Sequence, residues 1–96
     1  MRFAWDARKS SRNLRERGFD FEFATLIFDG PTLERHDTRR DYGELRVVAI
    51  GLAQGFALTV VYSDRVEADV VARRIISTRM SNRRERQAYF KAFEEE

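Results

Sequence analysis

The chain has 96 residues, which is enough for one domain with a single hydrophobic core (residues 1–96) and too few for two. It contains no cysteine and one histidine, which excludes a disulfide scaffold and argues against a structural zinc site. The formal charge is +2, 43% of the residues are hydrophobic, and no apolar run is long enough for a membrane span or a signal peptide, so we expect a soluble cytoplasmic protein.

The chain is expected to begin with an edge strand (residues 1–5) and to continue into a helix (residues 7–17). Asp6 suits the N-cap of this helix, and Gly18 suits the left-handed residue that ends it. The helix has a thin apolar stripe, which consists of Ala7, Ser11 and Leu14. A helix this polar faces either a charged partner or solvent.

A second, aromatic-rich helix is predicted over residues 21–28, with Asp20 as its cap and the sequence Asp-Gly-Pro as its stop. Four strands follow, because short β-branched runs alternate with turn residues. They are predicted at residues 32–38, 44–52, 56–63 and 70–78. Residues 54 and 55 form a hairpin turn, and residues 64–69 are predicted to be a charged loop.

The last helix is expected to run to Phe93, with Ser81 or Asn82 as its cap. Asn82 and Glu85 have the spacing of a capping box. Residues 94–96 are expected to fray. This order of elements predicts an α+β fold: an antiparallel sheet of about four to five strands, two N-terminal helices and one C-terminal helix, with the helices on one face.

The charges are strongly segregated along the chain. Residues 1–18 carry six basic and two acidic side chains, residues 19–72 carry five and ten, and residues 73–91 carry seven and one. Sixteen of the eighteen basic residues are arginine, whose planar fork matches phosphate oxygens. The pattern indicates a phosphate-facing side, or alternatively a solvated surface with internal ion pairs.

Several short motifs occur in order along nearly the whole chain. In the N-terminal part they comprise Trp5, Asp6, Lys9, Asn13, Gly18, Phe21, Ala24, Phe28, Asp29 and Pro31. Further on they comprise Tyr42-Gly43-Glu44 with Arg46 and Gly51, Val60-Val61-Tyr62 with Arg65, Arg74-Ile75-Ile76-Ser77 with Arg79, and Arg84-Glu85-Arg86 with Tyr89. This ordered set resembles the BrnT family of toxins. The chain departs from the family pattern at Arg17, often a histidine, and at Met80, often a lysine.

The resemblance implies a type II toxin with a RelE-like fold, which cleaves RNA without a metal or other cofactor and so inhibits translation and growth. It implies neutralisation by a BrnA-type antitoxin, in a hetero-oligomer of an antitoxin dimer with two toxins. RNA, in association with the ribosome, is the implied substrate. Operator DNA is contacted only through the antitoxin, and no membrane is involved.

Metal-independent RNA cleavage needs a base for the 2′-OH, cations for the charge that develops on phosphorus, and an acid for the leaving group. Arg46, Arg65, Arg74 and Arg79 come from different strands or their ends, so the sheet could bring them to one phosphate. Each of them is equally suited to a surface ion pair.

Three further residues are catalytic candidates, each with a structural alternative. Glu44 could act as the base or as the ion-pair partner of Arg46. His36, the single histidine, has the pKa range for acid–base work but is also typical of an exposed strand. Tyr62 could orient a phosphate or stack on a base, and packing in the core is an equal alternative.

A wider basic surface is predicted to bind RNA or an acidic antitoxin segment. It comprises Arg8, Lys9, Arg12, Arg15, Arg83, Arg84 and Arg86. A metal-dependent nuclease is a further alternative, and its acidic residues would be Asp29, Asp37, Asp41, Glu44 and Asp64. A non-enzymatic module that only grips RNA or an antitoxin, within an autorepressing complex, is favoured by Met80.

Overall fold

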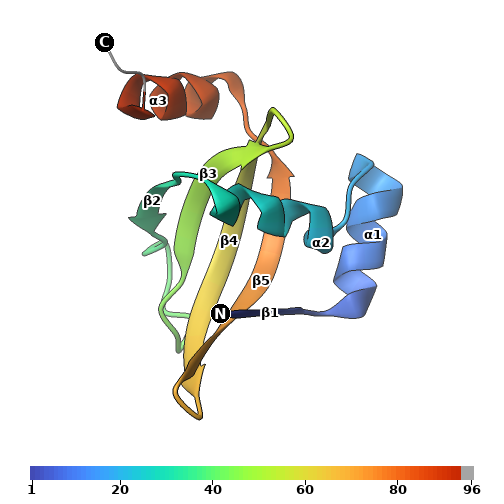
Figure 1. Ribbon diagram of the computed structural model, residues 1–96, viewed down its shortest axis with the longest axis vertical. Coiled ribbons are helices and arrows are strands. Elements are labelled where there is room, and N and C mark those ends of the chain that lie inside the picture. Colours follow the sequence, from blue (N-terminus) through green and yellow to red (C-terminus); the bar gives the residue numbers. More distant parts are fainter. Residues whose placement is uncertain (94–96) are drawn as a thin grey trace.

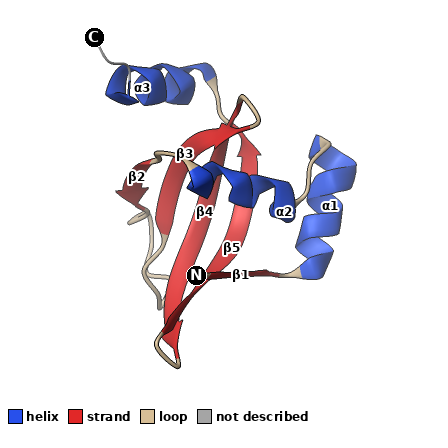
Figure 2. Ribbon diagram, viewed as in Figure 1, coloured by secondary structure: helices blue, strands red, loops and turns tan. Residues whose placement is uncertain are grey.

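The computed structural model describes residues 1–93, so the expected fraying of residues 94–96 lies outside it. The elements in chain order are β1 (Arg2–Trp5), α1 (Ala7–Arg17), α2 (Phe21–Ala24), the 3₁₀ helix η1 (Thr25–Asp29), β2 (Leu33–His36), β3 (Val47–Ala53), β4 (Phe56–Glu67), β5 (Val70–Met80) and α3 (Arg83–Phe93). The predicted α+β class with two N-terminal helices and one C-terminal helix is confirmed, with η1 continuing α2 (Figure 2).

The sheet has five strands in the order β1-β5-β4-β3-β2. All neighbours are antiparallel except β1, which pairs in parallel with β5 at one edge. In Figure 1, α2 and η1 cross one face of the sheet, α1 stands beside it, and α3 lies beyond one end of the strands. The sheet is therefore mixed at its edge, and α3 does not share the face that α2 covers.

Side chains alternate between the two faces of the sheet. The face that η1 covers, here called the helix face, carries the core residues Ala49, Leu58, Val60, Tyr62 and Ile75, which pack on Phe21, Ala24 and Ile27. Gly51 lies under η1, where an added Cβ would meet the Ile27 Cβ at 2.8 Å. A side chain at this position would push η1 off the sheet, so the glycine sets how closely the core packs.

The opposite face, here called the arginine face, owes its composition to a β-bulge. Arg74 and Arg79 are five positions apart, so a regular strand would point them to opposite sides. The register shifts between Val61 and Tyr62, which face Ser77 and Ile75, so Ile76 is the extra residue in β5. The bulge brings Arg74 and Arg79 onto one face, since their partners Ser63 and Thr59 are four residues apart on β4.

Three local predictions need correction. The predicted charged loop at residues 64–69 is instead strand to Glu67, because the ion pair of Asp64 with Arg73 (2.8 Å) links the two strands across the sheet. The strand predicted from residue 44 begins at Val47. In α1 the buried residues are Ser10 and Asn13, which bond to the backbone of the following turn, while the predicted stripe residue Leu14 is half exposed.

The predicted caps are confirmed. The Asp6 carboxylate accepts hydrogen bonds from the amides of Arg8 and Lys9, and Gly18 has φ +87°. At the start of α3 the Asn82 side chain accepts from the Glu85 amide (2.9 Å), and the Glu85 carboxylate accepts from the Asn82 amide (2.8 Å). Asn82, not Ser81, therefore forms the capping box.

Candidate functional site

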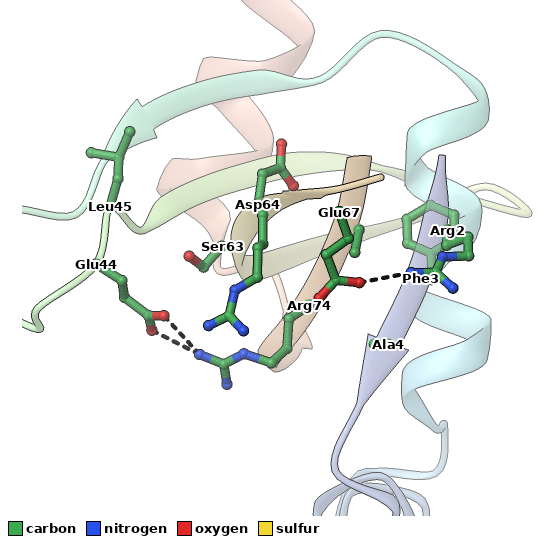
Figure 3. Close-up of a pocket in the computed structure, with 11 residues that line it drawn as sticks. Arg2, Phe3, Ala4, Glu44, Leu45, Ser63, Asp64, Glu67 and Arg74 are labelled. Carbon is green, nitrogen blue, oxygen red and sulfur yellow. Dashed lines mark hydrogen bonds and ion pairs between the residues drawn. The ribbon is translucent and has the colours of Figure 1, made fainter. Parts of the chain in front are cut away.

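Glu44 lies between two arginines at the arginine face. Arg46 donates from Nε to the carboxylate at 3.0 Å. Arg74 donates from Nη2 to both carboxylate oxygens at 2.9 and 2.8 Å, as Figure 3 shows. These bonds, chiefly those of Arg74, hold the pKa of Glu44 below its ordinary value. The carboxylate is therefore ionised at neutral pH and flanked by two guanidinium groups.

This cluster borders a groove of about 490 Å³ that runs toward β1. Two more arginines line it, Arg2 from β1 and Arg65 from β4. Arg2 is paired with Glu67 at 2.7 Å, whereas Arg65 is exposed and makes no ion pair within residues 1–93. The groove therefore holds a cation that is available to an anionic ligand.

The segment that carries Glu44, residues 37–46, is fixed by a second cluster that sequence reasoning missed. The Asp37 side chain is buried and accepts two hydrogen bonds from Arg39, at 2.8 and 2.9 Å, which lower the pKa of its carboxyl well below the ordinary range. Tyr42 donates to the same carboxylate at 3.3 Å, and the Arg46 guanidinium lies 4.0 Å from the centre of the Tyr42 ring. Arg46 is thus held between a ring and a carboxylate.

Arg79 belongs to a different part of the arginine face. It lies five residues beyond Arg74 on β5, roughly 16 Å at the usual rise per residue. Its guanidinium makes a bidentate ion pair with Glu85 (2.8 and 2.8 Å), which lowers the pKa of Glu85 to about 2. The structure thus brings Arg65 and Arg74 to one groove, holds Arg46 beside it through Glu44, and leaves Arg79 at the start of α3.

Tyr62 and His36 lie on the helix face, away from Glu44. Tyr62 is 4% exposed, its hydroxyl donates to Glu34 at 3.0 Å, and Arg73 stacks 3.9 Å above its ring. Burial, with the bond to Glu34, raises the pKa of Tyr62 to about 12. His36 pairs with Val47 and is exposed on this same face. The structure therefore separates both residues from the arginine groove.

The predicted wider basic surface is divided into two parts. Arg8, Arg12 and Arg15 border one depression on the outer side of α1, with Lys9 half-buried nearby. Arg83 and Arg84 are exposed at the start of α3, where Arg86 donates to the Ser81 carbonyl oxygen at 2.7 Å. Figure 1 places these two helices at opposite sides of the molecule, so one ligand covers both only if it is extended.

Met80 pairs with Leu58 and so faces the helix side of the sheet, opposite to Arg79. A lysine at this position would not join Arg74 in the groove. The departure from the family pattern therefore leaves the Glu44 cluster intact. Met80 therefore no longer favours a module that only binds RNA or an antitoxin.

The acidic residues considered for a metal site are dispersed. Asp37, Glu44 and Asp64 are each paired with a different arginine. Within residues 1–93, no three histidine, aspartate or glutamate side chains come together as a metal-binding group. Among the helices within residues 1–93, none has both the length and the apolar character that crossing a bilayer requires.

A comparison with protein families matches residues 5–85 to the model described as the ribonuclease toxin BrnT of type II toxin–antitoxin systems. A search of curated proteins finds no match. The family match covers Glu44, Arg46, Arg65, Arg74 and Arg79, and it ends at Glu85, the residue that pairs with Arg79. The chain belongs to the BrnT family of ribonuclease toxins, whose partner in a type II system is an antitoxin.

Proposed function

We propose that this toxin cleaves RNA without a metal ion, at the groove lined by Glu44, Arg65 and Arg74, with Arg46 bonded to Glu44 beside it. The observation that carries the proposal is the position of an ionised carboxylate between two guanidiniums, beside Arg65, which makes no ion pair within residues 1–93. Cleavage of an RNA phosphodiester needs a base together with cations, because the attacking hydroxyl loses a proton while negative charge grows on the phosphate oxygens.

In the proposed reaction, Arg65 and Arg74 bind the scissile phosphate, and Glu44 accepts the proton of the neighbouring ribose 2′-OH. The 2′-oxygen bonds to phosphorus, the bond to the 5′-oxygen breaks, and the leaving oxygen takes a proton from a water molecule. The resulting hydroxide takes the proton from Glu44, which restores the carboxylate. Binding of the phosphate draws Arg74 away from Glu44. Since Arg74 is the main cause of the lowered pKa of Glu44, the carboxylate becomes a stronger base when RNA is bound.

The other basic residues have supporting roles in this proposal. Arg79 holds the start of α3 through Glu85, and the exposed Arg83 and Arg84 guide the RNA strand electrostatically. Cleavage of messenger RNA, at the ribosome, accounts for inhibition of translation and growth. The antitoxin is of the BrnA type, with an antitoxin dimer binding two toxins and contacting the operator DNA.

The decisive experiment is cleavage of a single-stranded RNA by the purified toxin in excess EDTA. Cleavage is expected to persist, and Arg65→Ala and Arg74→Ala are each expected to reduce its rate by about 10²–10³-fold, the usual effect of removing one electrostatic stabiliser. Lys91→Ala, an exposed position on α3, removes the same charge outside the groove and should leave the rate unchanged. Unchanged cleavage in both arginine variants would exclude this groove as the site.

The alternative is a module that binds RNA or an antitoxin without cleaving. It is favoured by the ion pairs of Arg46, Arg74 and Arg79 with the toxin's own carboxylates. The same assay separates the two functions. Retention of RNA on the protein with no product, both in EDTA and with added Mg²⁺, would support the binding module.

A further inference from the structure

An apolar groove of about 430 Å³ lies on the opposite side of the sheet from Glu44, between the end of α1 and the adjoining ends of β4 and β5. Its inner residues are Phe19 and Phe23. Leu14 from α1, Phe56 from β4 and Met80 from β5 form its rim and are 50%, 54% and 48% exposed. Single exposed apolar residues are ordinary, but three around one groove mark an interaction surface.

Local hydrogen bonds and a ring contact hold the inner wall of the groove in place. The left-handed Gly18 turns the chain after α1, and the Asn13 side chain donates to the Phe19 carbonyl oxygen at 2.9 Å. Asp20 accepts from the Phe23 amide at 2.8 Å, and the rings of Phe19 and Phe23 meet edge to face at 6.0 Å. A preformed surface loses little conformational entropy when it binds a partner.

The charge around the groove selects the kind of partner. Arg17, in the last turn of α1, lines it. The one carboxylate among the lining residues, Asp20, is engaged by the Phe23 amide. The groove therefore fits a segment that has large apolar side chains and acidic residues beside them.

We propose that this groove binds an acidic, amphipathic segment of the antitoxin. Membership of the family implies an antitoxin as protein partner, and Arg17 supplies the charge that complements an acidic segment. The proposal does not depend on the assignment of the RNA site. It places an anchoring contact on the helix face, so a toxin altered in this groove escapes its antitoxin while the Glu44 cluster stays intact.

The test uses the toxin with the substitutions Leu14→Glu and Met80→Glu, together and singly, and its cognate antitoxin. Both positions are half exposed, so the variants should fold, and circular dichroism checks this. The affinity of the double variant for the antitoxin is expected to fall at least 100-fold, and co-expressed antitoxin should no longer rescue growth. RNA cleavage should stay at the wild-type level.

Phe90→Glu is the matched control, because Phe90 is 48% exposed on α3, outside the groove, and should keep its affinity for the antitoxin. Unchanged antitoxin affinity in the double variant would overturn the proposal. So would a change from dimer to monomer of the toxin alone with antitoxin affinity retained, because the groove would then bind a second copy. The affinity measurement needs no activity, so it decides this proposal even if the wild-type toxin fails to cleave RNA.

Discussion

At the residue scale, Glu44 can act as the catalytic base or as an ion-pair partner alone, and the two roles predict different effects of a substitution. As the base it would be needed for the chemical step, whereas as an ion-pair partner it would only restrain Arg46 and Arg74. We expect Glu44→Gln to lower kcat by about 10²–10⁴-fold, the usual contribution of a general base. The same change should leave RNA affinity equal or higher, because it releases two guanidiniums.

Single-turnover cleavage and RNA binding by fluorescence anisotropy measure the two quantities separately. In the wild type, kcat/KM should stay constant with falling pH until below the ordinary range of a glutamate, since its arginine partners lower the pKa of Glu44 in the free toxin. A Glu44→Gln variant with undiminished kcat would assign the carboxylate a positioning role alone.

The position of Tyr62 away from the arginine groove also follows from the alternation of neighbouring side chains in one strand. Tyr62 and Ser63 are neighbours in β4, yet Tyr62 packs in the core and Ser63 lines the arginine groove. Alternation along the strand makes this separation predictable once one face is assigned. The motif that contains Tyr62 does not by itself tell which side is buried.

At the element scale, α3 depends on its first turn. Asn82 and Glu85 exchange hydrogen bonds with each other's amides, and Glu85 also holds Arg79 on β5. Asn82→Ala is expected to destabilise the protein by about 1 kcal/mol, whereas Asn82→Ser, which keeps a capping oxygen, should cost much less. Urea unfolding measures the loss, and hydrogen exchange should locate it in α3. Equal stability of the alanine and serine variants would contradict this role for the cap.

The elements differ in how far the sequence specifies them. Capping residues and hydrophobic periodicity predict the helices well, because these signals are local. The extension of β4 to Glu67 depends on a cross-strand ion pair, and the parallel pairing of β1 depends on a distant strand. The bulge at Ile76 has no local signature, so the shared face of Arg74 and Arg79 could not be predicted from their spacing. The residue types of the site can therefore be predicted from the sequence, whereas their arrangement in space follows only from the tertiary structure.

At the scale of the whole molecule, the segregated charges combine into paired clusters. The acidic middle of the chain supplies Glu44 and Asp64 to arginines of β5, so much of the apparent basic surface is internally neutralised. The net positive charge that remains for RNA or an acidic partner comes mainly from α1, from Arg65 and from the start of α3. The two ligand surfaces proposed above lie on opposite faces of one sheet.

These pairs also predict how stability responds to acid. The pKa of Glu85 is about 2 in the folded protein and near 4.5 when unpaired, so its pair with Arg79 stabilises the fold above pH 4.5. That contribution should disappear as the pH falls from about 5 to 2, because the unfolded chain takes up the proton first. One proton limits the slope to about 1.4 kcal/mol per pH unit, and the partial exposure of Arg79 keeps the effect below that.

Urea unfolding of the wild type, Glu85→Gln and Arg79→Gln at pH 7, 4 and 3 tests this linkage. Glutamine at position 85 keeps an oxygen for the Asn82 amide, so the variant loses the charge and retains the cap. Both variants should be less stable than the wild type at pH 7 and should approach it at pH 3. A stability gap that stays constant over this range would show that the Arg79–Glu85 pair contributes nothing to the acid sensitivity of the fold.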